Sequence, residues 1–256
     1  MLLTFLRRFC LLVLSGLFLV SCVDTRQATY FNGVNDGSIT TQTPVPESII
    51  RPNDLLSITV TSLNATATEI FNTPNTAGSQ PGQGVAGYLV NSDGSIQFPM
   101  LGSIKASGFT KEQLKESIRK SITDRQLLKD PIVNIRYLNF RVTVLGEVKN
   151  PTVLTIPNEK ISLLEAIGLA GDLTIYGKRE NVLIIREENG QKLIKRINLN
   201  SSELLSSPYY YLKSDDVVYV EPNKAKVASA RGGQWVPAAL SALSLLVVVV
   251  DRLIAK

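Results

Sequence analysis

The fold of this chain is decided by one amphipathic stretch, FTKEQLKESIRKSI, which occupies residues 109–122. Thr110 and Gln113 have the spacing of a capping box, in which each side chain satisfies a backbone amide at the start of a helix. Apolar residues then recur every four positions and therefore share one side of that helix. They are Leu114, Ile118 and Ile122. The stretch predicts a helix that begins after Thr110 and buries this side.

Segments of alternating apolar and polar residues surround the helix and predict β-strands, because successive side chains of a strand point to opposite faces. They lie at residues 56–60, 87–90, 95–98, 132–137, 181–186, 192–198 and 216–220, with shorter ones around Val142 and Val153. Asp93-Gly94 is a strong signal for a hairpin turn between two of these strands.

A second capping box, Ser162 with Glu165, opens a second helix that ends at Gly171. Each half of the body thus contains one helix among several short strands. We therefore predict two small α+β domains, at residues 48–137 and 138–222, that meet near Leu138-Asn139. Residues 66–87, rich in Pro and Gly, predict an exposed insertion.

The first 22 residues have the layout of a secretion signal. Arg7 and Arg8 precede an apolar run of about 12 residues, too short for an ordinary membrane span of roughly 20. Leu19-Val20-Ser21-Cys22 resembles the lipobox of bacterial lipoproteins. That resemblance implies removal of residues 1–21 and attachment of lipid, with acyl chains such as palmitate, to Cys22. The alternative is an uncleaved anchor with an incidental cysteine.

Residues 22–47 are polar and lack a helical period, which predicts a tether to the first domain, with Tyr30-Phe31 as a local docking element. At the other end, a linker at 223–234 precedes the run WVPAALSALSLLVVVVDRLI at 235–254, uncharged until Asp251. A helix of this length can cross a membrane.

The polar residues of this C-terminal helix fall within one arc of a helical wheel. They are Gln234, Ser241, Ser244 and Asp251. One interpretation is that several copies pack side by side, with this arc facing a partner or a watery pore. The other is a single anchor, in which Asp251 lies at the membrane interface and the serines bond to their own backbone.

The composition excludes several classes of function. The chain has no His, which removes Ser-His-Asp triads and most zinc sites. Its two Cys, Cys10 and Cys22, lie outside the body, which therefore has neither a disulfide nor a thiolate metal site. A net charge of +5 is too small to indicate nucleic acid as a partner.

Three motifs are candidates for a binding or catalytic site. Residues 82–87 match G-x-G-x-x-G, but a polar run precedes them and a strand follows, so a nucleotide site is not predicted. The acid pairs Asp215-Asp216 and Glu187-Glu188 lie in turn-like surroundings, which favours turn chemistry and solvation over catalysis. The run 209–211, three tyrosines, offers either flat faces to sugars or a strand edge. We predict no catalytic residue, cofactor or metal.

Two regions resemble known domains. The first resembles the polysaccharide biosynthesis/export domain, in RPNDLLSITV (51–60), VNSDGSIQFPMLG (90–102) and GFT (108–110). The second resembles the soluble-ligand-binding β-grasp (SLBB) module, in VLGEVKNP (144–151), LLEAI (163–167), AGD (170–172) and DDVVYV (215–220). With the lipobox and the C-terminal run, the chain resembles the outer-membrane polysaccharide export lipoproteins of Gram-negative bacteria.

The chain departs from that family in detail. The family's Gly-Pro-Gly-Asp is Arg51-Pro52-Asn53-Asp54 here, where Asn53 can adopt the left-handed conformation that Gly supplies. Its Ala-Gly-Gly is Ala170-Gly171-Asp172, and one β-grasp module is visible where better-known members carry two.

The resemblance implies a homo-oligomeric ring, an octamer in the family, whose domains stack in the periplasm and whose C-terminal helices form a pore through the outer membrane. The implied partners are a capsular or exopolysaccharide cargo, membrane lipid and an inner-membrane polysaccharide co-polymerase or tyrosine kinase. We therefore expect an outer-membrane translocon subunit and not an enzyme. The alternative is an envelope-anchored structural or polymer-binding lipoprotein that forms no pore.

Overall fold

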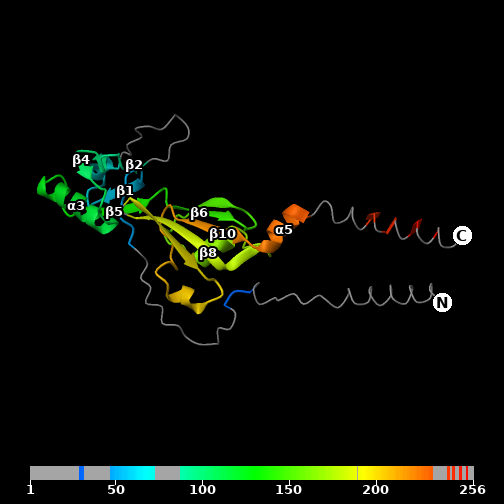
Figure 1. Cartoon of the computed structure of the whole chain (residues 1–256). Coiled ribbons are helices and arrows are strands. Elements are labelled where there is room, and N and C mark those ends of the chain that lie inside the picture. Colours follow the sequence, from blue (N-terminus) through cyan, green and yellow to red (C-terminus); the bar gives the residue numbers. More distant parts are fainter. Residues whose placement is uncertain are drawn as a thin grey trace.

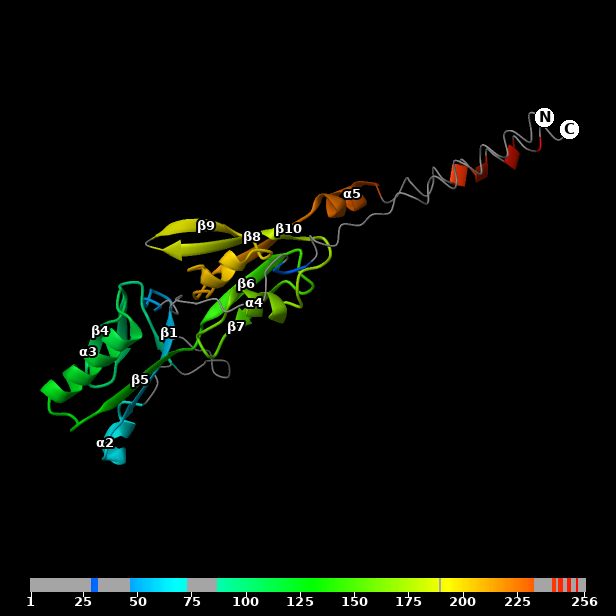
Figure 2. The same cartoon turned by 90° about the horizontal axis from the view of Figure 1, so that it is seen from below.

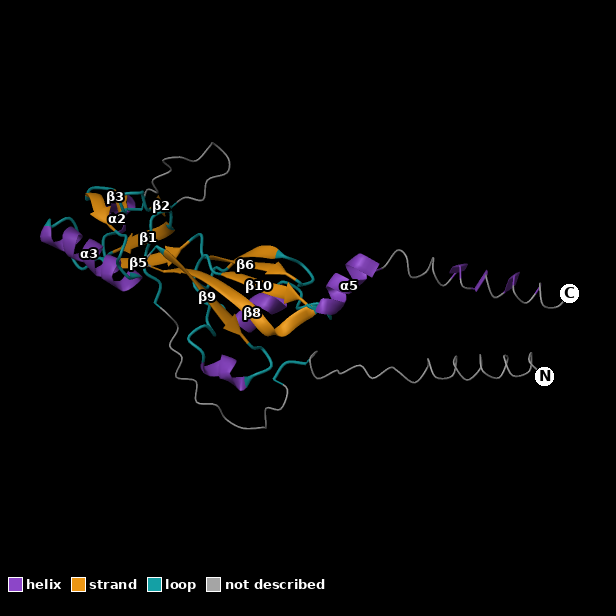
Figure 3. Ribbon diagram, viewed as in Figure 1, coloured by secondary structure: helices purple, strands orange, loops and turns teal. Residues whose placement is uncertain are grey.

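The computed structural model describes residues 29–31, 47–72, 87–188 and 190–232, and the single positions 241, 242, 244, 245, 248, 249 and 252. It contains two domains of mixed helix and strand that follow one another along an elongated molecule (Figures 1 and 3). The α+β class expected from the sequence is confirmed for both domains.

The first domain is built on a three-stranded antiparallel sheet in the order β2-β1-β5. A separate hairpin, β3-β4, and the helix α3, which packs on β5, complete it. Its elements are β1 (Leu55–Thr61), α2 (Ala65–Glu69), β2 (Tyr88–Leu89), β3 (Ser95–Phe98), β4 (Gly102–Lys105), α3 (Lys111–Asp124) and β5 (Ile132–Tyr137).

Helix α3 confirms the prediction from its sequence. The Thr110 hydroxyl accepts from the Gln113 amide at 3.3 Å, and the Gln113 side chain accepts from the Thr110 amide at 2.9 Å. Its three predicted core residues, Leu114, Ile118 and Ile122, are all 0% exposed. Burial of each such side chain contributes about 1.5–3 kcal/mol, so this face holds the helix to the sheet.

The hairpin predicted at Asp93-Gly94 is wrong. A tight turn does form there, with Gly94 at φ +82°, but the strands on its two sides enter different sheets. β2 pairs with β1, and β3 pairs with β4. The amides of Ala106 and Ser107 both bond to the Gly94 carbonyl at 2.9 Å, which ties the turn to the end of β4. The predicted insertion at 66–87 also begins differently, because α2 occupies its start.

The second domain is a five-stranded mixed sheet in the order β7-β6-β10-β8-β9. Its first and last strands, β6 and β10, pair in parallel at the centre, and all other pairs are antiparallel. Helix α4 packs across one face, giving the β-grasp arrangement that the resemblance implies. The elements are β6 (Arg141–Gly146), β7 (Thr152–Thr155), α4 (Leu163–Leu169), β8 (Gly177–Glu188), β9 (Gln191–Ile197), η2 (Ser202–Ser206) and β10 (Val217–Pro222).

Helix α4 has its predicted capping box, since Ser162 and Glu165 exchange side-chain-to-backbone bonds at 3.2 and 2.7 Å. It buries Leu163, Ala166 and Ile167. Leu169, which the sequence placed with the apolar face, is instead 62% exposed. The buried face has the helical spacing of Leu163, Ala166, Ile167 and Ala170, and Leu169 lies off that face.

The two domains meet at a polar seam. The Asn139 side chain accepts from the Leu55 amide at 2.9 Å and donates to the Asn53 carbonyl at 3.0 Å. Glu159 of the second domain accepts from the Tyr137 amide at 2.7 Å and pairs with Lys111 at the start of α3. Side chains of Asn139 and Glu159 thus form hydrogen bonds with backbone groups of the first domain.

The chain leaves the second domain through a helix, α5 (Lys224–Gly232), which occupies most of the predicted linker at 223–234. Of the predicted span at 235–254, the structure describes only seven separate positions, which are helical. Among the described residues, no helix combines the length and apolar character that a membrane crossing requires.

Candidate functional site

The second domain contains an ion pair beside a group of tyrosines, and both of its side chains are buried. Arg186 of β8 and Asp216, just before β10, are 5% and 1% exposed. The Arg186 Nε donates to Asp216 Oδ1 at 2.9 Å, and Nη2 donates to Oδ2 at 2.7 Å. This two-pronged geometry satisfies both charges, which burial would otherwise destabilise strongly.

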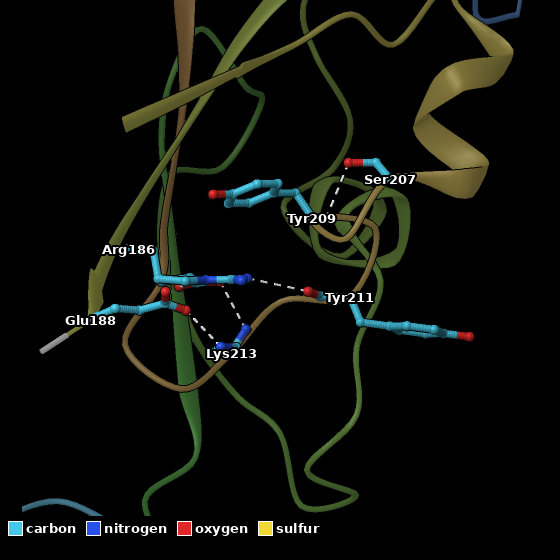
Figure 4. Close-up of polar contacts among 7 residues, drawn as sticks. Arg186, Glu188, Ser207, Tyr209, Tyr211 and Lys213 are labelled. Carbon is cyan, nitrogen blue, oxygen red and sulfur yellow. Dashed lines mark hydrogen bonds and ion pairs between the residues drawn. The ribbon is translucent and has the colours of Figure 1, made fainter. Parts of the chain in front are cut away.

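Three consecutive tyrosines, 209–211, lie on the loop between η2 and β10, and we call them the tyrosine cluster. The Tyr209 ring lies 5.0 Å from the Arg186 guanidinium, and the Tyr211 carbonyl accepts from Arg186 Nη2 at 3.3 Å (Figure 4). The Tyr211 ring points away from the ion pair in that view, and Lys160 Nζ lies 4.8 Å from its centre. Tyr210 meets Tyr211 edge-on at 5.0 Å.

This arrangement is neither of the simple forms considered from the sequence. The segment is not a strand edge, since only Tyr211 forms an isolated bridge, to Ser162. All three rings are half-buried, and one face of Tyr209 is covered by Arg186. An aromatic face can stack on a sugar ring, and a cation beside it can attract an acidic group carried by that sugar.

The adjacent acid pairs separate in space. Asp215 pairs with the exposed Arg141 at 2.7 Å, while its neighbour Asp216 is buried against Arg186. Glu188 pairs with Lys213 at 2.6 Å, and the Lys213 hydrogen bond holds the pKa of Glu188 below its usual range. The predicted turn and solvation therefore apply to Asp215, whose φ is +65°, but not to Asp216.

No local sequence pattern predicts the buried pair, because its two members lie 30 residues apart, one in β8 and the other just before β10. The only available signal was Arg186, a charged residue at an inward position of an alternating strand. Among the residues that the structure describes, no group of three or more metal-ligating side chains converges.

The turn that carries the first motif has the predicted conformation. Asn53 has φ +72°, and its amide donates to the Val90 carbonyl at 2.8 Å. The Asp54 carboxylate accepts from the Arg51 amide at 2.7 Å and closes the turn. Burial raises the pKa of Asp54 to about 6, an effect that the Arg51 amide opposes and the nearby charge of Asp215 reinforces.

Of the predicted site residues, Cys22, Gln234 and Asp251 lie outside the described residues. Ser241 and Ser244 are helical and exposed, and the Ser244 hydroxyl donates to the Ser241 carbonyl at 2.8 Å. This is the bond expected of a serine whose hydroxyl donates to a backbone carbonyl of its own helix.

Comparison with known proteins identifies both domains. A family model described as polysaccharide biosynthesis/export protein matches residues 42–138, and an SLBB domain model matches residues 140–220. The chain is similar to the EPS I polysaccharide export outer membrane protein EpsA of Ralstonia solanacearum, with 31% identity over 144 residues, 55% of this chain and 37% of that protein. The protein of the same name from Ralstonia nicotianae is 32% identical over 141 residues, 54% of this chain and 36% of that protein.

The chain thus spans little more than a third of the length of these relatives. The two domain matches nevertheless follow one another directly and cover both domains of the structure. Residues 42–138 of this chain form a domain of the polysaccharide biosynthesis/export family, and an SLBB domain follows at residues 140–220.

Proposed function

We propose that the protein is an outer-membrane subunit of a polysaccharide export apparatus, and that its copies form a conduit for a capsular or exopolysaccharide. The observation that carries this proposal is the direct succession of an export domain and an SLBB domain, at residues 42–138 and 140–220. Relatives named for EPS I export in the outer membrane support the same assignment. The proposal includes lipid on Cys22, both domains in the periplasm, and no catalytic step.

The second domain offers a surface for assembly of copies. Register places a set of residues on the sheet face opposite α4, because paired residues share a face. None of them is buried in the described chain, and Ile194 is 63% exposed. The apolar residues on this face of the sheet are Leu145, Val153, Leu183, Ile185, Ile194, Val217 and Tyr219. A sheet with apolar side chains on both faces is typical of one that is covered on both sides, which favours packing of another copy here.

A second candidate is an envelope-anchored lipoprotein that binds polymer or other proteins without forming a pore. The hydrogen bond from Ser244 to the Ser241 carbonyl favours it, because a serine satisfied within its own helix needs no watery lumen.

Deletion and complementation of the gene test the proposed function. Loss of the protein should remove polysaccharide from the cell surface while polymer is retained inside the cell, and the wild-type gene should restore it. A variant with Ile194→Asp should be made at normal level but fail to restore export, and its detergent-extracted particle should be smaller. Unchanged surface polymer in the deletion strain would contradict the proposal.

A further inference from the structure

The N-terminal segment Thr29–Phe31 does not dock on the first domain, to which the chain leads next, but on the second. The Tyr30 hydroxyl donates to the Asp172 carboxylate, 142 residues away in the chain. The Phe31 amide donates to the Leu199 carbonyl at 3.3 Å. Both rings are half-buried and pack against the apolar core.

Arg179 completes this contact from below. It is only 6% exposed, and its guanidinium lies 5.4 Å from the centre of the Tyr30 ring. In the described part of the chain, its Nε is buried without a hydrogen-bond partner. The Tyr30 ring therefore lies over a buried cation, a contact that stabilises the charge.

Asp172 follows directly after helix α4, in the sequence Ala170-Gly171-Asp172. Its φ is +70°, a left-handed conformation that suits Gly and strains Asp. A glycine would fit the backbone better but would offer no carboxylate to Tyr30. The Asp172 carboxylate accepts from the Leu173 amide at 2.6 Å as well as from the Tyr30 hydroxyl, so it joins the incoming segment to the loop.

The loop that begins at Asp172 also holds the start of α5. The Tyr176 carbonyl accepts from the Asn223 amide at 2.7 Å, and Lys226 of α5 lies 5.2 Å from the Tyr176 ring. The loop at residues 172–176 thus binds the incoming segment through Asp172 and the outgoing helix through Tyr176. Figure 2 shows the blue segment 29–31 and α5 at the same end of the second domain, away from α3.

We propose that Tyr30, Asp172 and Arg179 form a clamp that fixes the N-terminal segment to the second domain of its own chain, so that both ends of the folded body leave from one loop. One consequence of the clamp rests on the proposed function. If Cys22 carries lipid, the eight residues from Cys22 to Tyr30 can span at most about 29 Å between the membrane and the clamp. The α5 end of the second domain then lies close to the membrane, and the first domain points away from it.

Photocrosslinking on the full-length, detergent-extracted protein tests who the partner is. A benzoylphenylalanine at Phe31 should crosslink within a single chain, to peptides that contain Leu199. Crosslinked dimers, or crosslinks to the first domain, would overturn the proposal. The same experiment with Cys22→Ala separates the clamp from lipid attachment: the crosslink should persist in the unlipidated protein, and its loss there would mean that the membrane anchor, and not the clamp, produces the docking.

Hydrogen exchange of the Phe31 amide tests which residues make the clamp. Asp172→Gly should speed exchange about tenfold, because a hydrogen bond to a charged group is lost while the backbone strain is relieved. Tyr30→Phe should act in the same direction. Asp215→Gly is the matched control, since Asp215 is also a left-handed aspartate in an exposed contact but lies outside the clamp. Equal exchange in Asp172→Gly and the control would sink the proposal.

Discussion

The two domains differ in how deeply they bury ion pairs. In the export domain, the ion pairs within α3, Glu112 with Lys115 and Glu116 with Arg119, are both solvent-exposed. In the SLBB domain, Arg186 and Asp216 are buried together under the tyrosine cluster. The export domain therefore depends mainly on apolar packing, whereas the SLBB domain also depends on a charge pair that tolerates the loss of neither partner. The two domains should respond differently to substitution.

The largest effect is expected at the buried pair. Asp216→Asn leaves the Arg186 charge buried without its counter-charge and should cost about 3–5 kcal/mol of unfolding free energy. The double variant Arg186→Met with Asp216→Leu should recover much of that loss. Denaturant unfolding of the full chain measures both, and Asp215→Asn, in an exposed pair, should cost less than about 1 kcal/mol. An equal cost at Asp215 and Asp216 would contradict the special weight given to the buried pair of the SLBB domain.

Apolar truncation should give the next largest effect and should be similar in both domains. Leu114→Ala and Leu163→Ala each remove a side chain that is 0% exposed and should cost about 2–5 kcal/mol. The same unfolding measurement compares them. A neutral Leu114→Ala would mean that the inner face of α3 has been assigned wrongly.

In the export domain, a pH-dependent effect is expected from the buried carboxyl of Asp54. The folded pKa of Asp54 is about 6, above its unfolded value near 4, so the folded state binds the extra proton between these pH values. The unfolding free energy should therefore fall as pH rises from about 4 to 6, by up to about 3 kcal/mol. Asp54→Asn keeps an acceptor for the Arg51 amide but cannot ionise. Its stability should match the wild type near pH 4 and exceed it above pH 6, and parallel pH profiles would contradict this account.

The smallest effect should be the same in both domains, because both helices begin with the same device. Thr110→Ala and Ser162→Ala each remove the hydroxyl of a capping box and should cost about 1 kcal/mol. Thermal unfolding of the two single variants provides the comparison. A cost at Ser162 several times that at Thr110 would show that the second bond of the Ser162 hydroxyl, which it donates to the Glu165 carboxylate at 2.9 Å, adds to the cap.

Local chemistry explains what could be read from the sequence. The two capping boxes and the left-handed Asn53 depend on residues within a few positions of one another, and the structure confirms them. The Asp93-Gly94 turn shows the limit of that logic: its conformation was predictable, but the choice of β1 and β4 as strand partners depends on the whole sheet.

The candidate site was less predictable than the fold. The tyrosine cluster can be recognised in the sequence as three consecutive tyrosines. The ion pair beside it joins Arg186 of β8 to Asp216 at the start of β10, and no local pattern predicts a pair of residues 30 positions apart. The docking of Tyr30 on Asp172 is hidden for the same reason.

The central claim, that polymer passes through a conduit formed by copies of this chain, is tested most directly by blocking the C-terminal segment in living cells. Single cysteines at Ser244 and at Leu246 are treated with a bulky, membrane-impermeant thiol reagent, and surface polysaccharide is then measured at constant protein level. We predict that Ser244→Cys is labelled and that its adduct lowers surface polymer, while Leu246→Cys stays unlabelled because thiolate forms poorly in hydrocarbon. Equal, negligible labelling at both positions, or full labelling at Ser244 with export unchanged, would contradict the conduit.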